Sequence, residues 1–270
     1  MNDPKIAQIL ATTEHRPWPL PHRPWVQVQA WNHLLFAHWA VDSDYLRPML
    51  PRELPLDIYD GRAWVGVTPF VVTGLGPRGL PPIPGVSRFC ELNVRTYTSG
   101  LDGKPGVYFF SLDCESLLAV IGARIGHGLP YLYARMFADV VEGEVRFYCR
   151  RMDVDRARPE FHGNVSPDLE LLRTRAEFRG RYRPAGPVRL RAPGTVEHFL
   201  TERYCLYTVQ RGRVYRAQIH HVQWPLQDAS ADVEANTMAL ADGIRLPDSP
   251  PLLHYAKRLK VMVWAEERIA

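Results

Sequence analysis

Apolar and polar residues alternate along much of the chain, which is the pattern of β-strands that bury one face. Two clear examples are SRFCELNVRTYT at residues 87–98 and RTRAEFRGRYRP at residues 173–184. Further strands are predicted at residues 26–31, 34–41, 63–72, 106–113, 129–141, 144–152, 202–210 and 213–224, and an apolar segment at 252–269 closes the chain. Most of these strands are neighbours in sequence and they outnumber the helices. We therefore expect an α+β fold built on a mainly antiparallel sheet or barrel.

A few helices and one long loop are predicted between the strands. A short helix in DSDYLRPML begins near Asp42 or Ser43, because both residue types are good N-caps. A second helix is predicted at residues 115–125, with Asp113 as its N-cap. Residues 74–85 are rich in proline and glycine, so we expect a loop there.

The turn GHGLP at residues 126–130 contains glycines of the kind found in ligand-binding loops. Glycines that bind phosphate lie between a strand and the N-terminus of the next helix. Gly126 and Gly128 instead follow a predicted helix and precede a strand, so we expect them to end that helix with positive φ angles. The turn is therefore not expected to bind a phosphate.

The motif HRPW occurs twice within residues 1–25. Its prolines predict a rigid, extended arm that Trp18 and Trp25 hold against the body of the protein. The sequence leaves open whether the arm packs on its own domain or on a second subunit of a homo-oligomer.

Because no linker composition divides the chain, we expect one domain, residues 1–270.

The composition indicates the cellular compartment in which we expect the protein. Apolar residues make up 46% of the 270 residues, but no apolar run approaches the roughly 20 residues that span a bilayer. The N-terminus MNDPKIAQIL lacks the apolar segment of a secretory signal. Cys90, Cys114, Cys149 and Cys205 lie far apart, so we expect reduced, buried thiols. These features predict a cytoplasmic protein without a membrane partner.

The net charge is +4, and arginine supplies nearly all of the positive charge, since lysine occurs only at positions 5, 104, 257 and 260. Arginines alternate with aromatic residues in the strand 173–184, a combination that also occurs in proteins that bind single-stranded nucleic acid. Glu177 lies among them and no nucleic-acid motif accompanies them, so we expect a solvated face and no nucleic-acid partner. His220 and His221 are adjacent on a strand and point to opposite faces, so we expect no metal and no cofactor.

Each of two predicted strands carries polar side chains on one of its faces. On the strand 87–98, the face that carries Glu91, Asn93 and Arg95 lies opposite an apolar face. This polar face is either in contact with solvent or lines an enclosed cavity. On the strand after the turn, Tyr131, Tyr133 and Arg135 share a face, and arginine can bind an anionic or enolate-like group there. One of His220 and His221 is either a cavity acid or base or a hydrogen-bonded core residue.

Several motifs together resemble a known superfamily. FCELNV, GVYFFSLD, a small-residue helix and a G-x-P turn follow one another as in the acetoacetate decarboxylase-like superfamily. The fuller pattern runs from HRPWPLP and LLFAHWAV through LPYLYARM and RAQIHHVQWPLQ to PLLHYAKRLKVMVW. Over nearly the whole chain it resembles an uncharacterised bacterial branch of that superfamily, a domain family of unknown function.

The resemblance implies a cavity inside a barrel-like cone of strands. In the decarboxylase, a lysine in the turn forms a Schiff base with a β-keto acid, a second lysine lowers its pKa, and a glutamate helps to position the substrate. Glu91 matches the glutamate, whereas Tyr131 and Leu132 occupy the two lysine positions. Tyrosine cannot form an iminium ion, so we expect no Schiff-base decarboxylation. Because position 131 faces the cavity in the superfamily, Tyr133 and Arg135 are expected to face it too.

The sequence thus predicts a protein that binds a small organic molecule, a keto acid or carboxylate, in an internal cavity. If it is an enzyme, a lyase or isomerase, Glu91 is the general acid or base, and Tyr131 and Arg135 stabilise an oxyanion or enolate without a covalent bond. The candidate ligand-binding residues are Asn93, Arg95, Tyr133 and His220. The alternatives are a non-catalytic binding protein and a structural or oligomer-forming protein whose own side chains fill the cavity.

Overall fold

The structure is a computed structural model that describes residues 4–82, 86–116, 131–152, 175–210 and 212–270. Its strands are β1 (Gln27–Val41), β2 (Ala63–Pro77), β3 (Arg88–Ser99), β4 (Pro105–Cys114), β5 (Tyr131–Val141), β6 (Glu144–Arg151), β7 (Glu177–Pro184), β8 (Cys205–Gln210), β9 (Arg213–His220), β10 (Gln227–Asn236), β11 (Leu252–Val263) and β12 (Glu267–Arg268). Its helices are α1 (Pro4–Ala11), α2 (Ser43–Leu46), the 3₁₀ turn η1 (Arg47–Met49), α5 (Val196–Thr201) and α6 (Met238–Ala241). Strands therefore dominate the described residues, as the alternation predicts.

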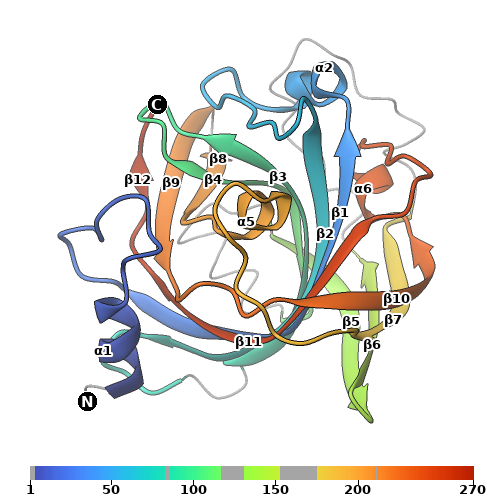
Figure 1. The fold of residues 1–270 in the computed structure, drawn as a ribbon, viewed down its shortest axis with the longest axis horizontal. Coiled ribbons are helices and arrows are strands. Elements are labelled where there is room, and N and C mark those ends of the chain that lie inside the picture. Colours follow the sequence, from blue (N-terminus) through green and yellow to red (C-terminus); the bar gives the residue numbers. More distant parts are fainter. Residues whose placement is uncertain (1–3, 83–85, 117–130, 153–174, 211) are drawn as a thin grey trace.

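These strands form one sheet in the order β12-β9-β8-β4-β3-β2-β1-β11-β10-β7-β6-β5. Pairing of β9 with β11 closes seven of them into a ring, and Figure 1 shows α5 at the centre of this ring. Pairing of β4 with β5 closes a path of nine strands that runs through β10, β7 and β6. β4 pairs in parallel with β5 and with β8, and the other described pairings are antiparallel. The predicted α+β fold, a mainly antiparallel barrel with a few helices, is confirmed.

The strand β3 is buried on both faces. Cys90, Leu92 and Val94 lie in the core that separates the central strands from the layer β5-β6-β7-β10. Side chains of the opposite parity, among them Phe89 and Glu91, face α5, β8 and β9. The alternation predicted for this strand is therefore confirmed. Because both faces are covered, the polar row on β3 is not a solvated surface.

Asp113 does not cap a helix, because it lies within β4 and binds Arg151 of β6. Nε and Nη2 of Arg151 donate hydrogen bonds of 2.8 Å to the two carboxylate oxygens of Asp113, and Nη1 donates one of 2.7 Å to Asp242. All three side chains are buried. The expected turn at residues 126–130, and the preceding helix from residue 117 onward, lie outside the described residues.

Two local predictions have different outcomes. Asp42 is the N-cap of α2, and its Oδ1 accepts two backbone N–H groups at 2.8 and 3.1 Å, so the predicted start of this helix is confirmed. The loop predicted at residues 74–85 is wrong in its first part, because β2 continues to Pro77 and pairs there with the start of β1. Gly74 adopts a φ of 65° within this extension, which glycine permits without strain.

The N-terminal arm packs against its own chain. Arg16 donates a 2.7 Å hydrogen bond to the carbonyl oxygen of Ile219, and Trp18 Nε1 donates one of 2.9 Å to Gln218 Oε1. The ring of Trp25 lies under the guanidinium of Arg78, 5.3 Å from its carbon Cζ. The arm therefore covers the outside of β9, and its first residues form the helix α1, which the alternation does not predict.

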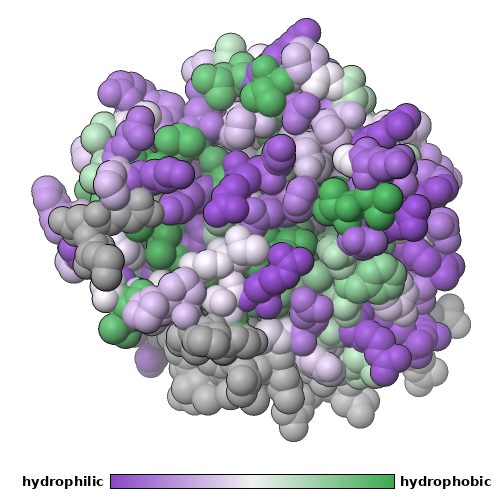
Figure 2. Space-filling view, turned by 90° about the horizontal axis from the view of Figure 1, so that it is seen from below, coloured by the Kyte–Doolittle hydropathy of each residue, from purple (hydrophilic) through white to green (hydrophobic). Residues whose placement is uncertain are grey.

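The outer surface is mostly polar on the side seen in Figure 2, where apolar side chains form small, separate groups. Among the helices of the described residues, none has the length and apolar character needed to cross a membrane. The four cysteines are buried free thiols.

Candidate functional site

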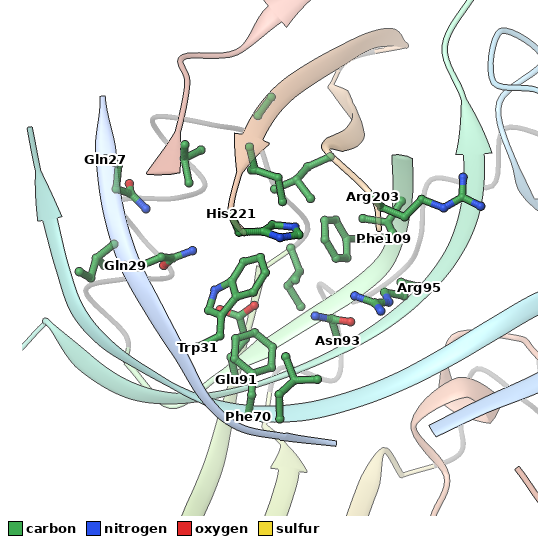
Figure 3. Close-up of a pocket in the computed structure, with 18 of the residues that line it drawn as sticks. Gln27, Gln29, Trp31, Phe70, Glu91, Asn93, Arg95, Phe109, Arg203 and His221 are labelled. Carbon is green, nitrogen blue, oxygen red and sulfur yellow. The ribbon is translucent and has the colours of Figure 1, made fainter. Parts of the chain in front are cut away.

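The barrel contains a cavity of about 450 Å³ on the side of the central strands that faces α5, β8 and β9. Leucine, valine, phenylalanine and tryptophan side chains form most of its wall. The polar side chains that line it are Gln27, Gln29, Glu91, Asn93, Arg95, Tyr131, Thr201, Arg203 and His221. In Figure 3, the two glutamines lie at one side of the cavity and the two arginines at the other, with Glu91 and Asn93 between them.

The buried Glu91 and the half-buried Tyr131 form a hydrogen-bonded pair in this cavity. The Tyr131 hydroxyl donates to Glu91 Oε2 at 2.9 Å. Glu91 is only 6% exposed, and burial raises the pKa of its carboxyl to about 8, although the hydrogen bond from Tyr131 acts in the opposite direction. Burial and the nearby Glu91 carboxyl raise the pKa of Tyr131 as well. At pH 7 both groups are therefore mainly protonated, and the remaining oxygen of Glu91 can carry the acidic proton.

Arg95 supplies the positive charge of the cavity. Its guanidinium carbon lies 5.2 Å from the centre of the Phe36 ring and 5.8 Å from that of Tyr97, so aromatic faces hold the side chain in place. Within the described residues Arg95 has no acidic partner, and its buried Nε has no hydrogen-bond acceptor.

Arg203, the other cavity arginine, is neutralised. Its Nη1 donates to Asp57 Oδ2 at 2.6 Å, and its Nε donates to the carbonyl oxygen of Phe199 at 2.6 Å. With Glu91 mainly protonated and Arg203 paired, the positive charge of Arg95 is left without compensation by the described lining residues. A single positive charge in apolar surroundings favours the binding of a ligand with one negative charge.

His221 lines the described cavity wall, whereas His220, which the sequence suggested as a ligand-binding residue, does not. Adjacent residues on an extended chain point to opposite faces. His220 turns toward the arm, where its Nε2 lies 2.8 Å from the carbonyl oxygen of Ile9. His221 Nδ1 lies 2.7 Å from the carbonyl oxygen of Val222, and burial, together with nearby His220, His15 and Arg16, lowers the pKa of His221 to about 3. His221 is therefore a neutral wall residue.

Tyr133 and Arg135 also lie away from the described cavity wall, contrary to expectation. Only the first three residues of β5 pair with β4, and from Ala134 onward the strand pairs with β6. Beyond Tyr131, the face of β5 that carries this residue becomes part of the outer surface of the layer β5-β6-β7-β10. Arg135 is exposed there, next to the stacked rings of Phe137 and Tyr148, whose centres lie 5.5 Å apart.

The sequence reasoning did not assign five polar lining residues to the site: Gln27, Gln29, Thr201, Arg203 and His221. Gln27, Gln29 and Trp31 alternate in β1, so their shared face was readable from their spacing. Arg203 lies between α5 and β8, where no periodicity applies. His221 follows the end of β9, and its side of the wall depends on how that strand closes the ring.

The family model described as uncharacterized conserved protein, DUF2071, matches residues 28–260. The chain belongs to this family. A relative in Bacillus subtilis (strain 168), "Uncharacterized protein YqjF", is 42% identical over 245 residues, which cover 91% of this DUF2071 chain and 93% of the relative. The predicted membership in a domain family of unknown function is therefore confirmed.

Solved structures share the fold of this DUF2071 chain at low sequence identity. Acetoacetate decarboxylase from Legionella pneumophila superposes with a TM-score of 0.56 and 12% identity, over 95% of this chain and 94% of that one. An acetoacetate decarboxylase-like enzyme from Sphingomonas wittichii RW1 gives 0.56 and 12%, over 92% and 94%. The enduracididine biosynthesis enzyme MppR, in complex with pyruvate, gives 0.56 and 10%, over 94% and 93%. The acetoacetate decarboxylase-like fold is thus confirmed.

Proposed function

We propose that the barrel cavity binds a small organic acid, a keto acid or related carboxylate, without forming a covalent bond to it. Arg95 is the site for a ligand carboxylate, and the protonated Glu91 is the hydrogen-bond donor for a ligand carbonyl group. The observation that carries this proposal is the guanidinium of Arg95, which has no acidic partner among the described residues, in the same cavity as the neutral pair of Glu91 and Tyr131. The pyruvate complex of MppR, which shares the fold, is consistent with a ligand of this class.

A Schiff-base mechanism needs a lysine amine in the cavity. The four lysines lie elsewhere: Lys104 forms an ion pair of 2.9 Å with Asp102 at a hairpin turn, Lys5 and Lys257 are exposed, and Lys260 is on β11 outside the cavity wall. Tyr131, which occupies the position of the reactive lysine in the sequence resemblance, donates a hydrogen bond to Glu91 instead. These positions support non-covalent binding.

If the site is catalytic, its chemistry is acid catalysis on a carbonyl group. A protonated Glu91 carboxyl can donate to a carbonyl oxygen of the ligand and so promote the loss of an α-proton to water, which gives an enol, while the hydrogen bond from Tyr131 holds the carboxyl in place. Arg95, rather than Arg135, supplies the cavity guanidinium and binds the ligand carboxylate. Because the acid form of Glu91 is the active form, activity should decline as the pH rises through about 8.

Two experiments test the proposal. Isothermal titration calorimetry with pyruvate and acetoacetate should detect binding that Arg95→Met weakens and Arg258→Met, at an exposed position on β11, does not. Borohydride treatment with either keto acid, followed by mass spectrometry, should leave the protein mass unchanged. A covalent adduct would refute the non-covalent mechanism, and binding unaffected by Arg95→Met would refute the assigned site.

Catalysis and simple binding can also be separated. NMR spectra of pyruvate in deuterated buffer report exchange of its methyl protons, which enolisation accelerates. A catalytic site should accelerate this exchange above the buffer rate, and Glu91→Gln should abolish the acceleration. Binding without acceleration would assign the cavity to a non-catalytic binding protein. A purely structural role fits poorly with an open volume of about 450 Å³ beside the neutral pair.

A further inference from the structure

We propose that the preferred ligand is an extended amphipathic monocarboxylate rather than a three- or four-carbon keto acid. Its carboxylate binds Arg95, an apolar body lies along β3, and a second polar group, a carbonyl or hydroxyl, binds Glu91 and Tyr131. This inference rests on the function proposed above and narrows the class of ligand.

The two polar sites are separated along one strand. Glu91 and Arg95 are four residues apart on the same face of β3, which places their Cα atoms about 13 Å apart. Side chains on one face of a strand stand roughly perpendicular to the sheet, so their ends stay apart as well. Figure 3 shows Glu91, Asn93 and Arg95 as a row. The carbonyl and carboxylate of pyruvate are on adjacent carbons, so that molecule cannot reach both ends of the row.

The space between the two sites is bounded by aromatic side chains. Phe70 pairs with Glu91 across β2 and β3, and Phe109 pairs with Arg95 across β3 and β4. Both rings line the cavity with Trp31, whose ring centre lies 5.9 Å from that of Phe70. A ligand that connects the two polar sites therefore needs an apolar, preferably aromatic, body.

Asn93 lies in the middle of the row but is already engaged on one side. Thr68 Oγ1 donates to Asn93 Oδ1, and both side chains are buried. The carbonyl oxygen of this amide is therefore occupied by the protein, and only its NH₂ group remains for a ligand. A single extra donor does not create a third charged site, so the row remains a cation at one end and a neutral acid at the other.

The size of the cavity agrees with an extended ligand. At about 30 Å³ for each water-sized group, a volume near 450 Å³ holds about 15 such groups. Pyruvate, with about six non-hydrogen atoms, would leave more than half of this apolar space to water. Since a ligand gains affinity by covering apolar wall, the larger molecule should bind more tightly.

The test uses matched probes that differ in one feature. The full probe is 3-(4-acetylphenyl)propanoate, which carries a carboxylate and a ketone at opposite ends of an aromatic ring. Its methyl ester lacks the charge, 3-(4-ethylphenyl)propanoate lacks the carbonyl, and pyruvate lacks the body. Calorimetry with the full-length protein should show the tightest binding for the full probe, by at least tenfold over pyruvate.

Protein variants show which residue binds each end of the probe. Arg95→Met should weaken the full probe by roughly tenfold to a hundredfold and leave the methyl ester unchanged, because a hydrogen bond to a charged group is lost only with the acid. Glu91→Gln should weaken the full probe more than 3-(4-ethylphenyl)propanoate. Arg258→Met is the control for lost charge, and Arg95→Lys, which keeps a cation, should recover part of the affinity if the fold is intact.

The outcomes separate the two proposals. Pyruvate that binds through Arg95 as tightly as the full probe would overturn the extended ligand and leave the proposed function in place. An equal loss of acid and ester on Arg95→Met would also overturn the assigned carboxylate end. Failure of every carboxylate to bind the folded protein would overturn both proposals.

Discussion

Replacing Glu91 by glutamine should stabilise the protein, and the gain should grow with pH. The pKa of this carboxyl rises from 4.5, its ordinary value, to about 8 on folding because the group is buried. The folded state therefore holds a proton that the unfolded chain releases above pH 4.5. The stability contributed by this proton is fully present below pH 4.5, declines above it, and is lost once the pH passes 8.

The magnitude follows from the width of this window. Each pH unit between the two pKa values lowers the free energy of unfolding by about 1.4 kcal/mol. Between pH 5 and pH 8 the wild-type protein should lose about 4 kcal/mol through this one group. Glutamine keeps the shape of the side chain and an oxygen for the Tyr131 hydroxyl, but it has no proton to release. The variant should therefore avoid this loss.

Urea unfolding of wild type and Glu91→Gln at pH 5 and pH 8 measures the effect directly. The stability difference between the two proteins should be about 4 kcal/mol larger at pH 8 than at pH 5. Glu53→Gln is the matched control, because Glu53 is exposed, and its effect should not depend on pH to this extent. An equal difference at both pH values would show that Glu91 is not a buried, protonated acid.

Two further substitutions test the parts of the fold that hold the site. Arg151→Met should cost about 3–5 kcal/mol of unfolding free energy, because it leaves two buried carboxylates without their cation, and Arg146→Met at the exposed end of β6 should cost far less. Gly106→Ala should cost about 1–3 kcal/mol, since the added Cβ would meet the carbonyl oxygen of Cys205 at 2.4 Å where β4 pairs with β8. Gly186→Ala is the control, with its nearest neighbour at 3.6 Å. Urea unfolding checks both pairs, and equal costs for a variant and its control would contradict the structure.

The alternation along the chain predicts much of this fold, because the two faces of a strand can be read from the spacing of its own residues. The two faces of β3 follow from a period of two, so Glu91, Asn93 and Arg95 could be assigned together. The same reasoning does not predict the strand β10. The apolar residues in its sequence QDASADVEAN are alanines and a single valine, and no residue of the strand is fully buried, so the apolar signal is weak.

The rest of the site depends on contacts between distant parts of the chain. The charge of Arg203 is neutralised by Asp57, which lies 146 residues earlier. The face of Tyr131 reaches the cavity only while β5 pairs with β4, and nothing in the local pattern shows that Arg135 lies beyond that point. Closure of the ring by β9 and β11 decides that His221, and not His220, lines the cavity.

A crystal structure of the protein with 3-(4-acetylphenyl)propanoate is the most direct test of the cavity as a two-ended carboxylate site. We expect the probe inside the barrel, with its carboxylate within hydrogen-bond distance of the Arg95 guanidinium and its ketone next to Glu91 and Tyr131. A probe bound in the reverse orientation, or bound outside the barrel, would contradict it.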